Sequence, residues 1–258
     1  FLAGAKGFIT SEKTFGDLLS SRSSEEIPIP TQSLPPTPKP TSHPTKKAYL
    51  IAAIGDSMID TMGGSLDYLK AAMIKKYPGI DFVMYNYGIG NENVSAALER
   101  FDKPFVRGQQ NYGALPELAP DLLIVGSYSY NPFPIQDKNK HASDLTRIIQ
   151  KAKNAPDGVY LLAEIAPLEN DFGDGVGGVN WTDEAARAQS TKIVELLENT
   201  IVLSDKIDVE LIDVYSASRV ENSRFGKREY VDFHDNIHPS VLGHTFTAET
   251  IVESIILK

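Results

Sequence analysis

The sequence feature that most constrains the fold is a regular alternation of short apolar runs and longer amphipathic stretches that begins at residue 47. Five apolar runs, several of them bounded by turn residues, predict β-strands at 48–54, 81–88, 121–127, 158–167 and 209–214. Each run is followed by a helix-like stretch, at 59–76, 94–101, 140–154, 182–203 and 240–257. Strands that alternate with helices form parallel sheets that are covered on both faces. The sequence therefore predicts an α/β domain over 47–258, with a five-stranded parallel sheet between two layers of helices.

A proline-rich segment separates this domain from the beginning of the chain. Seven of the sixteen prolines fall within residues 28–44, interleaved with serine and threonine. Proline fixes φ and lacks the donor N–H, so this composition gives an extended, semi-rigid spacer. We therefore expect a membrane-proximal segment at 1–27, a linker at 28–46 and the α/β domain at 47–258. Because such spacers are typical of tethered envelope enzymes, we expect an extracytoplasmic location, with a membrane or wall tether through a region upstream of Phe1.

Composition and charge exclude several classes of function. The chain of 258 residues has a net charge of -9, with acidic residues spread along it, which argues against nucleic acid or an anionic membrane surface as the main partner. It has no cysteine, so disulfides, thiolate zinc sites and cysteine nucleophiles are excluded. No apolar run approaches the roughly 18 residues of a membrane span, and no signal peptide is visible. A small neutral substrate or an uncharged polymer fits this composition best.

Polar residues follow the predicted strands at the edge of the sheet where ligands bind, because parallel strands place their carboxyl ends together. The first run ends in Gly-Asp-Ser at Ser57, which is either a turn with a helix cap or the site of a nucleophilic hydroxyl near a helix N-terminus. The second is followed by a turn with Gly88 and Gly90, whose backbone N–H groups could face outward. The third is followed by Asn131, which is either a turn residue before Pro132 or a neutral donor for an oxyanion.

The segment 232–244 contains the densest group of histidines and aspartates in the chain. Asp235 and His238 are three residues apart on a predicted loop, so the carboxylate can accept from the imidazole and the ring can serve as general base for a hydroxyl. A metal site is the alternative, because His234 and His238 are four residues apart. Pro239 argues against a shared helical face, since the residue before a proline is pushed out of the helical region.

These blocks, in this order, resemble the SGNH or GDSL hydrolase family. The resemblance covers residues 47–258 in the order and spacing of its motifs. It implies a three-layer, flavodoxin-like fold, the SGNH hydrolase fold, and a serine esterase that needs no cofactor. By the same resemblance, Ser57 is the nucleophile and His238 is the base, oriented by Asp235.

The resemblance also implies an oxyanion hole made by the backbone N–H groups of Ser57 and Gly90 and the side chain of Asn131. Gly90 is preferred to Gly88 because the glycine of the family usually precedes a short polar run, such as Asn-Glu-Asn-Val here. The third block departs from the pattern. The family commonly has Gly-x-Asn-Asp, whereas this chain has Pro132 after the asparagine, so the turn that presents the amide must differ.

The sequence thus predicts a serine ester hydrolase that cleaves acetyl or short acyl esters through an acyl-enzyme, with extracellular glycans among the candidate substrates. A lysophospholipase or a thioesterase remains open. From a different class, a non-catalytic carbohydrate-binding or adhesion module on the same fold is the rival, motivated by the altered third block and the linker. A metal-dependent hydrolase centred on His234, Asp235 and His238 is a third alternative.

The glycine-rich segment 170–181 follows the fourth predicted strand and lacks the Gly-Lys-Ser/Thr of a phosphate loop. We expect a mobile loop anchored by Trp181, with a substrate-facing lid as its functional interpretation. The aromatic residues Tyr128, Tyr130 and Phe133 either line a pocket or pack beneath this edge of the sheet.

Overall fold

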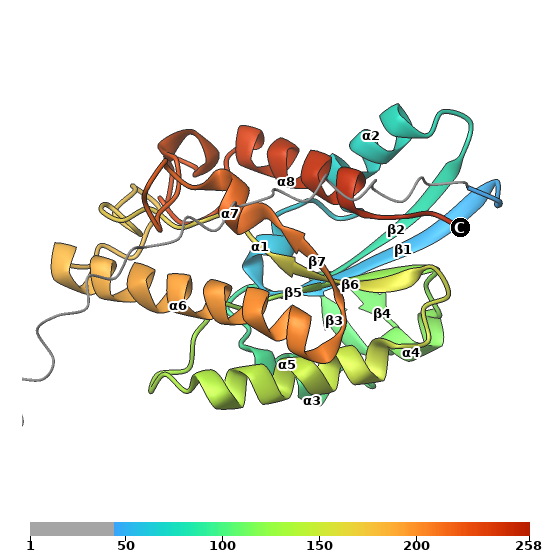
Figure 1. Cartoon of the computed structure of the whole chain (residues 1–258), viewed down its shortest axis with the longest axis horizontal. Coiled ribbons are helices and arrows are strands. Elements are labelled where there is room, and N and C mark those ends of the chain that lie inside the picture. The colour runs from blue at the N-terminus through green and yellow to red at the C-terminus, as the bar shows by residue number, and fades with distance from the viewer. Residues whose placement is uncertain (1–43) are drawn as a thin grey trace, which may run out of the picture. The chain divides into compact units, whose positions relative to one another are not determined.

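A computed structural model of the chain describes residues 44–258; the predicted segment 1–27 and all but the last three residues of the predicted linker lie outside the described residues. Its centre is a five-stranded parallel sheet with helices on both faces (Figure 1). The predicted three-layer α/β fold is confirmed. The strands, in the sheet order β2-β1-β5-β6-β7, are β1 (Ala48–Gly55), β2 (Asp81–Gly88), β5 (Leu122–Gly126), β6 (Gly158–Ala163) and β7 (Glu210–Asp213).

Two apolar cores lie on opposite faces of the sheet, because side chains alternate along each strand. In β1, Ile51 and Ala53 join one core, whereas Ala52 and Ile54 join the other. All four side chains are buried. A strand that is buried on both faces has an unbroken apolar sequence rather than an alternating one, which is why these strands were visible as apolar runs.

The helices divide between the two faces of the sheet (Figure 1). One core is covered by α2 (Asp67–Lys76) and α8 (Val241–Ser254), which pack against each other. The other is covered by α3 (Val94–Arg100) and α5 (Lys138–Ala152), which also pack together, and α6 (Asp183–Ile207) contributes to both cores. In the part of the chain that the structure describes, no helix is both long and apolar enough to cross a lipid bilayer.

The helix predicted at 59–76 is two helices in the structure. The first, α1 (Ser57–Asp60), ends after one turn, and α2 follows after a loop. The side-chain amide of Asn86 ends α1, because it donates to the carbonyl oxygens of Ile59 and Gly63 at 2.8 and 2.7 Å. Gly63 has a φ of +96°, which turns the chain away from the helix. The break therefore depends on a residue of β2 as well as on the local glycine.

An antiparallel hairpin that the sequence did not predict lies between α3 and β5. Its strands are β3 (Phe105–Arg107) and β4 (Gln110–Tyr112), and the short α4 (Leu115–Leu118) follows. One aromatic ring from each strand packs against Tyr87 of β2, with ring centroids 5.5 and 5.2 Å apart. The hairpin is therefore attached to the edge strand of the sheet. Two further short helices, α7 (Val214–Ser218) and the 3₁₀-helix η1 (Arg228–Tyr230), lie between β7 and α8.

The first described residues are fixed at the amino ends of the strands. The hydroxyl of Tyr49 accepts from the backbone N–H groups of Thr45 and Lys46 at 3.0 and 3.2 Å. The same hydroxyl donates to the carbonyl oxygen of Lys258 at 2.7 Å. The ammonium group of Lys46 pairs with Asp121, just before β5, at 2.7 Å. Both ends of the described domain thus meet at the sheet edge opposite the carboxyl ends of the strands.

Candidate active site

The carboxyl ends of the strands surround a cleft of about 720 Å³. One side of it, here called the polar wall, comes from the segments after β1 and β2 and consists of Asp60, Thr61, Asn91 and Asn93. The other side, the apolar wall, comes from the segments after β6 and β7 and consists of Phe172, Val179, Trp181 and Ile237. Because β2 and β6 lie on either side of β1 and β5, the segments after β2 and β6 flank Ser57 and Asn131, which follow the two central strands.

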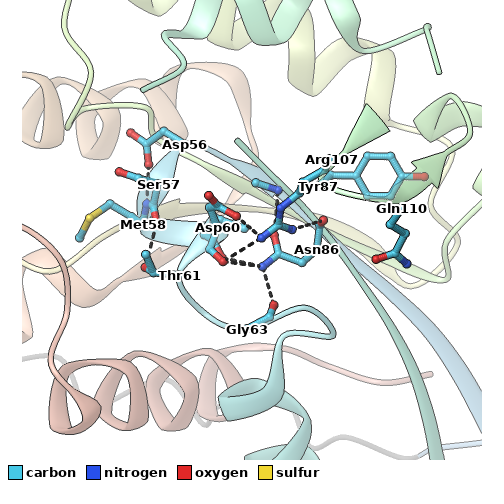
Figure 2. Close-up of polar contacts among 12 residues, drawn as sticks. Asp56, Ser57, Met58, Asp60, Thr61, Gly63, Asn86, Tyr87, Arg107 and Gln110 are labelled. Carbon is cyan, nitrogen blue, oxygen red and sulfur yellow. Dashed lines mark hydrogen bonds and ion pairs between the residues drawn. The ribbon is translucent and has the colours of Figure 1, made fainter. Parts of the chain in front are cut away.

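Ser57 lies at the first position of α1, directly after the buried β1 strand. The carboxylate of Asp56 caps this helix by accepting from the backbone N–H of Met58 at 3.0 Å (Figure 2). Ser57 itself is partly exposed and lines the cleft. The two interpretations of Gly-Asp-Ser are therefore compatible, because the aspartate provides the cap and the serine hydroxyl is left at the cleft.

The imidazole of His238 is oriented by Asp235. The distance from His238 Nδ1 to Asp235 Oδ2 is 2.5 Å. Asp235 Oδ1 also accepts from the backbone N–H groups of Ile237 and His238 at 2.8 and 3.0 Å. Partial burial alone would raise the pKa of Asp235, but the hydrogen bonds from the ring and from the two backbone N–H groups hold that pKa below its usual value. His238 Nδ1 therefore donates to a carboxylate, which leaves Nε2 as the nitrogen that can act as a base.

Ser57 and His238 line the same cleft. Within the described residues, no hydrogen bond joins the Ser57 hydroxyl to the imidazole. Hydrogen bonds between a nucleophile and its base are often long in free enzymes and tighten when substrate binds. The structure thus brings these two residues together at one cleft without a direct bond between them.

The structure distinguishes the two glycines after β2. Gly90 lines the cleft, and its backbone N–H makes no hydrogen bond within the described residues. The N–H of Gly88 donates to Asn86 Oδ1 at 2.8 Å and is already used. A Cβ on Gly88 would lie 2.3 Å from the backbone nitrogen of Asp60, so this glycine allows β2 to approach α1. Gly90 is therefore the candidate oxyanion donor of the two.

Asn131 reaches the cleft despite Pro132. Its side-chain Nδ2 donates to Asp56 Oδ2 at 3.0 Å, which leaves the second amide hydrogen for a ligand. The turn that presents it is built on Tyr128, which has a φ of +59° and whose carbonyl oxygen accepts from the N–H of Asn131 at 3.3 Å. Burial raises the pKa of Asp56 to about 6, although the hydrogen bonds from Met58 and Asn131 oppose that rise.

No family model matches the chain and no curated protein matches it by sequence, but solved structures share its fold. A lipase/acylhydrolase from Enterococcus faecalis superposes with a TM-score of 0.57 at 18% sequence identity, over 80% of this chain and 94% of that one. The chain has the SGNH hydrolase fold. A GDSL-like lipase from Bacteroides thetaiotaomicron shares it, with a TM-score of 0.56 and 14% identity over 80% of this chain and 86% of that one. So does a catalytic mutant of an acetylxylan esterase from Geobacillus stearothermophilus, with a TM-score of 0.56 and 14% identity over 81% and 95%.

On this SGNH hydrolase fold, an arginine from the unpredicted hairpin fixes the polar wall. Arg107 of β3 donates to the carbonyl oxygens of Asn86 and Asp60 at 3.1 and 3.2 Å. It also forms an ion pair with the carboxylate of Asp60 (Figure 2). Sequence reasoning missed this residue, because nothing in the sequence marked the hairpin that carries it.

A second ion pair holds the segment that carries Gly90. Arg100 of α3 donates to both carboxylate oxygens of Glu92 at 2.7 Å each, and to the carbonyl oxygen of Tyr87 at 2.7 Å. Bidentate pairing of this kind fixes the relative orientation of the two groups as well as their distance. The two residues are eight positions apart, so no helical i to i+4 pattern revealed them.

A buried glutamate that the sequence analysis did not single out lies beneath the cleft. Glu164 follows β6, and its Oε1 accepts from the backbone N–H of Ser127 at 2.8 Å while its Oε2 contacts the hydroxyl of Ser127. That hydroxyl lies 2.6 Å from the hydroxyl of Ser129, so Glu164 supports the segment that leads to Asn131. Burial, and then the negative charge of Asp56, raise the pKa of Glu164 to about 8, so its carboxyl group is mostly neutral at pH 7.

Two other histidines of the predicted cluster are absent from the lining of the cleft. His234 is exposed, whereas His244 is buried in α8, where its ring stacks on Tyr68 with centroids 4.7 Å apart. Burial, and then the neighbouring His238, lower the pKa of His244 to about 4. Among residues 44–258, no three histidine, aspartate or glutamate side chains converge in an arrangement that could hold a metal ion.

Of the three aromatic residues predicted after β5, one lines the cleft. Tyr130 belongs to the lining, and its hydroxyl donates to the carbonyl oxygen of Ile165 at 2.9 Å. Tyr128 is fully buried, and Phe133 lies beneath the ammonium group of Lys140, which is 5.1 Å from the ring centroid. The pocket interpretation holds for Tyr130, and the packing interpretation holds for the other two.

Proposed function

We propose that the chain is a serine ester hydrolase that cleaves acetyl or short acyl esters through an acyl-enzyme at Ser57. The observation that carries the proposal is a single cleft that holds a hydroxyl, an oriented imidazole and two candidate oxyanion donors. Its lining includes Ser57, Gly90, Asn131 and His238. These are the groups that acyl transfer to a serine requires.

In the proposed reaction, His238 Nε2 takes the proton of Ser57 Oγ as the hydroxyl attacks the ester carbonyl, and Asp235 stabilises the imidazolium. The carbonyl oxygen becomes an oxyanion, which accepts from the backbone N–H groups of Ser57 and Gly90 and from Asn131 Nδ2. The intermediate collapses as His238 gives the proton to the departing alcohol oxygen. Water then attacks the acyl-enzyme with His238 as base, which releases the acid and restores the Ser57 hydroxyl.

We further propose an acetyl group on a neutral sugar as the substrate. The indole of Trp181 is 39% exposed in the apolar wall and offers a face to a sugar ring, while the amides of Asn91 and Asn93 in the polar wall offer partners to hydroxyls. One structural neighbour is an acetylxylan esterase, and catalytic mutants of it replace a serine or an aspartate. The net charge of -9 disfavours anionic polymers.

The extracytoplasmic location and the membrane or wall tether stay proposals that rest on the proline-rich linker at 28–46. Most of that linker lies outside the described residues. Protease treatment of intact and lysed cells tests the location, because a tethered outer protein is cleaved before lysis. Protection until lysis would contradict it.

A fluorophosphonate probe tests the proposed activity. We expect stoichiometric labelling of the purified chain at Ser57, located by mass spectrometry, and hydrolysis of a chromogenic acetate ester. Ser57→Ala should abolish both, and His238→Ala should lower both rates by about 1000-fold or more. Ser216→Ala changes an exposed serine of α7 away from the cleft lining and should leave both unchanged.

The outcomes separate the alternatives. A wild-type chain that is inert toward both the probe and the ester would overturn the proposal and favour a non-catalytic sugar-binding module. Activity that is lost on chelation and restored by added metal would favour the metal-dependent alternative. A series of esters from acetyl to palmitoyl should give its highest rate with acetyl, and a maximum at long chains would favour a lysophospholipase or thioesterase instead.

A further inference from the structure

The glycine-rich loop between β6 and α6 packs directly on the segment that precedes His238. Where the sequence predicted a mobile loop, the structure has hydrogen bonds that tie the loop to this segment. The N–H of Gly177 donates to the carbonyl oxygen of His234 at 2.7 Å, and the N–H of Gly173 donates to that of Asn236 at 3.3 Å. Further backbone hydrogen bonds close the loop on itself.

Two glycines of this loop would place a Cβ closest to an atom of His234. A Cβ on Gly175 would lie 2.3 Å from the carbonyl oxygen of His234 and 2.7 Å from Asp235 Cα. A Cβ on Gly177 would lie 2.2 Å from Nε2 of the His234 ring. Real Cβ atoms essentially never approach other heavy atoms within 3.0 Å, so any side chain here must displace something. The two glycines differ in what they would displace, which is backbone at Gly175 and a side chain at Gly177.

The backbone that lies against Gly175 includes that of Asp235, the residue that orients the imidazole of His238. Asp235 meets the loop through its main chain, while its carboxylate binds His238 Nδ1 at 2.5 Å and two backbone N–H groups of the turn. These bonds join Asp235 and the ring in one short turn, so a shift of the first is passed to the second. Misplacement of a catalytic group by about 1 Å can cost on the order of 100-fold in rate.

The same loop also carries most of the apolar wall. Phe172 precedes the glycines and Trp181 follows them, and their ring centroids are 6.3 Å apart. Val179 adds an aliphatic group to the lining between them. One surface of the loop therefore faces the cleft, and another surface supports the turn that holds the imidazole.

We propose that Gly175 and Gly177 are positioning residues for His238. Gly175 leaves room for the main chain of 234–235, and Gly177 leaves room for the His234 ring while its N–H donates to the carbonyl oxygen of His234. They do not belong to the lining of the cleft. The inference rests on the proposed function, in which His238 is the general base.

A double-mutant cycle on Gly177 gives the sharpest test. The methyl of Gly177→Ala would overlap the His234 ring, so we expect kcat to fall about 10-fold while KM stays within about 3-fold. His234→Ala removes the obstacle, because that ring is exposed and absent from the cleft lining. The double variant should therefore return to within about 3-fold of the kcat of His234→Ala.

The companion cycle on Gly175 should behave differently. The methyl of Gly175→Ala would meet the carbonyl oxygen of residue 234, which remains when the His234 ring is removed. We expect a fall in kcat of about 100-fold that His234→Ala does not relieve. Two controls should stay within about 2-fold of wild type. Val176→Ala lies in the same loop with a side chain that is 95% exposed, and Gly64→Ala adds a methyl in open space.

A signal that needs no turnover completes the test. The N–H proton between His238 Nδ1 and Asp235 should give a downfield proton NMR resonance in wild type, which we expect to shift or broaden in both glycine variants and to recover in the Gly177→Ala/His234→Ala chain. Wild-type kcat and an unchanged resonance in both glycine variants would overturn the inference, as would a change confined to KM. Since the resonance is independent of catalysis, an inert wild-type chain would count against the proposed function and leave the positioning role to be decided by the spectrum.

Discussion

The polar wall and the apolar wall of the cleft are supported in different ways. Ion pairs from Arg107 and Arg100 hold the polar wall, because they fix Asp60 and Glu92. Main chain holds the apolar wall, because the glycine-rich loop packs on residues 234–236 where a side chain does not fit. The polar wall is therefore sensitive to the loss of side chains, and the apolar wall to their gain.

The two supports also affect different catalytic groups of the proposed reaction. The polar wall adjoins Gly90, a candidate oxyanion donor, whereas the loop of the apolar wall supports the turn that holds His238. Substitutions in the polar wall should change how charge on the substrate is stabilised without moving the base. Substitutions in the loop should change the base even where they are remote from the substrate.

The largest effect expected in the proposed oxyanion hole lies between the walls, at Asn131. Asn131→Ala removes an oxyanion donor that is supported by a side chain, Asp56. We expect kcat to fall about 100-fold, or about 3 kcal/mol in the transition state, with little change in KM, because the donor acts as charge develops. Steady-state kinetics measure this, with Asn111→Ala on the exposed side of β4 as the control. A variant within a few-fold of wild type would leave the oxyanion to the Ser57 and Gly90 backbone groups alone.

A further effect, on the pH dependence of the free energy of unfolding rather than on kcat, is expected at Glu164, which lies beneath the cleft. Its pKa rises from 4.5 to about 8 on folding, so the folded chain keeps a proton that the unfolded chain has already released. The free energy of unfolding should therefore fall as the pH rises from about 5 to about 8. Glu164→Gln cannot ionise and should lose most of this decline.

Urea denaturation at the two pH values measures the Glu164 effect. Glu184→Gln, which changes an exposed glutamate of α6, is the matched control and should decline as the wild type does. If the free energy of unfolding of Glu164→Gln falls with pH as steeply as that of the control, a group other than Glu164 keeps the proton in the folded chain. In that case Glu164 supports the Asn131 segment as a charged group.

The smallest effect is expected in the polar wall itself, at Arg107. The Asp60 carboxylate lies 3.5 Å from the place where a Cβ on Gly90 would be, and Arg107 neutralises it. Arg107→Ala leaves that charge unpaired near the developing oxyanion, so we expect kcat to fall about 10-fold, or about 1.4 kcal/mol. Adding Asp60→Asn should restore most of the loss, and Val106→Ala, on the same strand, is the control. A double variant no better than Arg107→Ala would exclude charge as the cause.

The sheet was predictable because its signal is local. Each strand is buried and parallel, so it appears as an apolar run that turn residues bound, and all five predicted runs overlap observed strands. The β3–β4 hairpin was missed because each of its strands has three residues and most of them are at least partly exposed. The end of α1 was missed because Asn86, on another strand, helps to determine it.

The candidate site was predictable where its chemistry is short-range. Asp235 and His238 are three residues apart, and the structure places them at hydrogen-bond distance as the spacing suggested. The contacts that support the two walls of the cleft join residues far apart in the sequence. Arg107 reaches Asp60 across 47 positions, and a Cβ at position 177 would overlap the ring at 234, so neither relation is visible until the chain has folded.

The hydroxyl of Tyr49 forms hydrogen bonds with both ends of the described domain, at the amino edge of the sheet. The mouth of the cleft lies at the carboxyl edge. Immobilisation of the domain on a bead, or fusion to another protein, through either end should therefore leave the cleft accessible even to a polymer. A layer of molecules attached in this way would present all its clefts outward, with a common orientation.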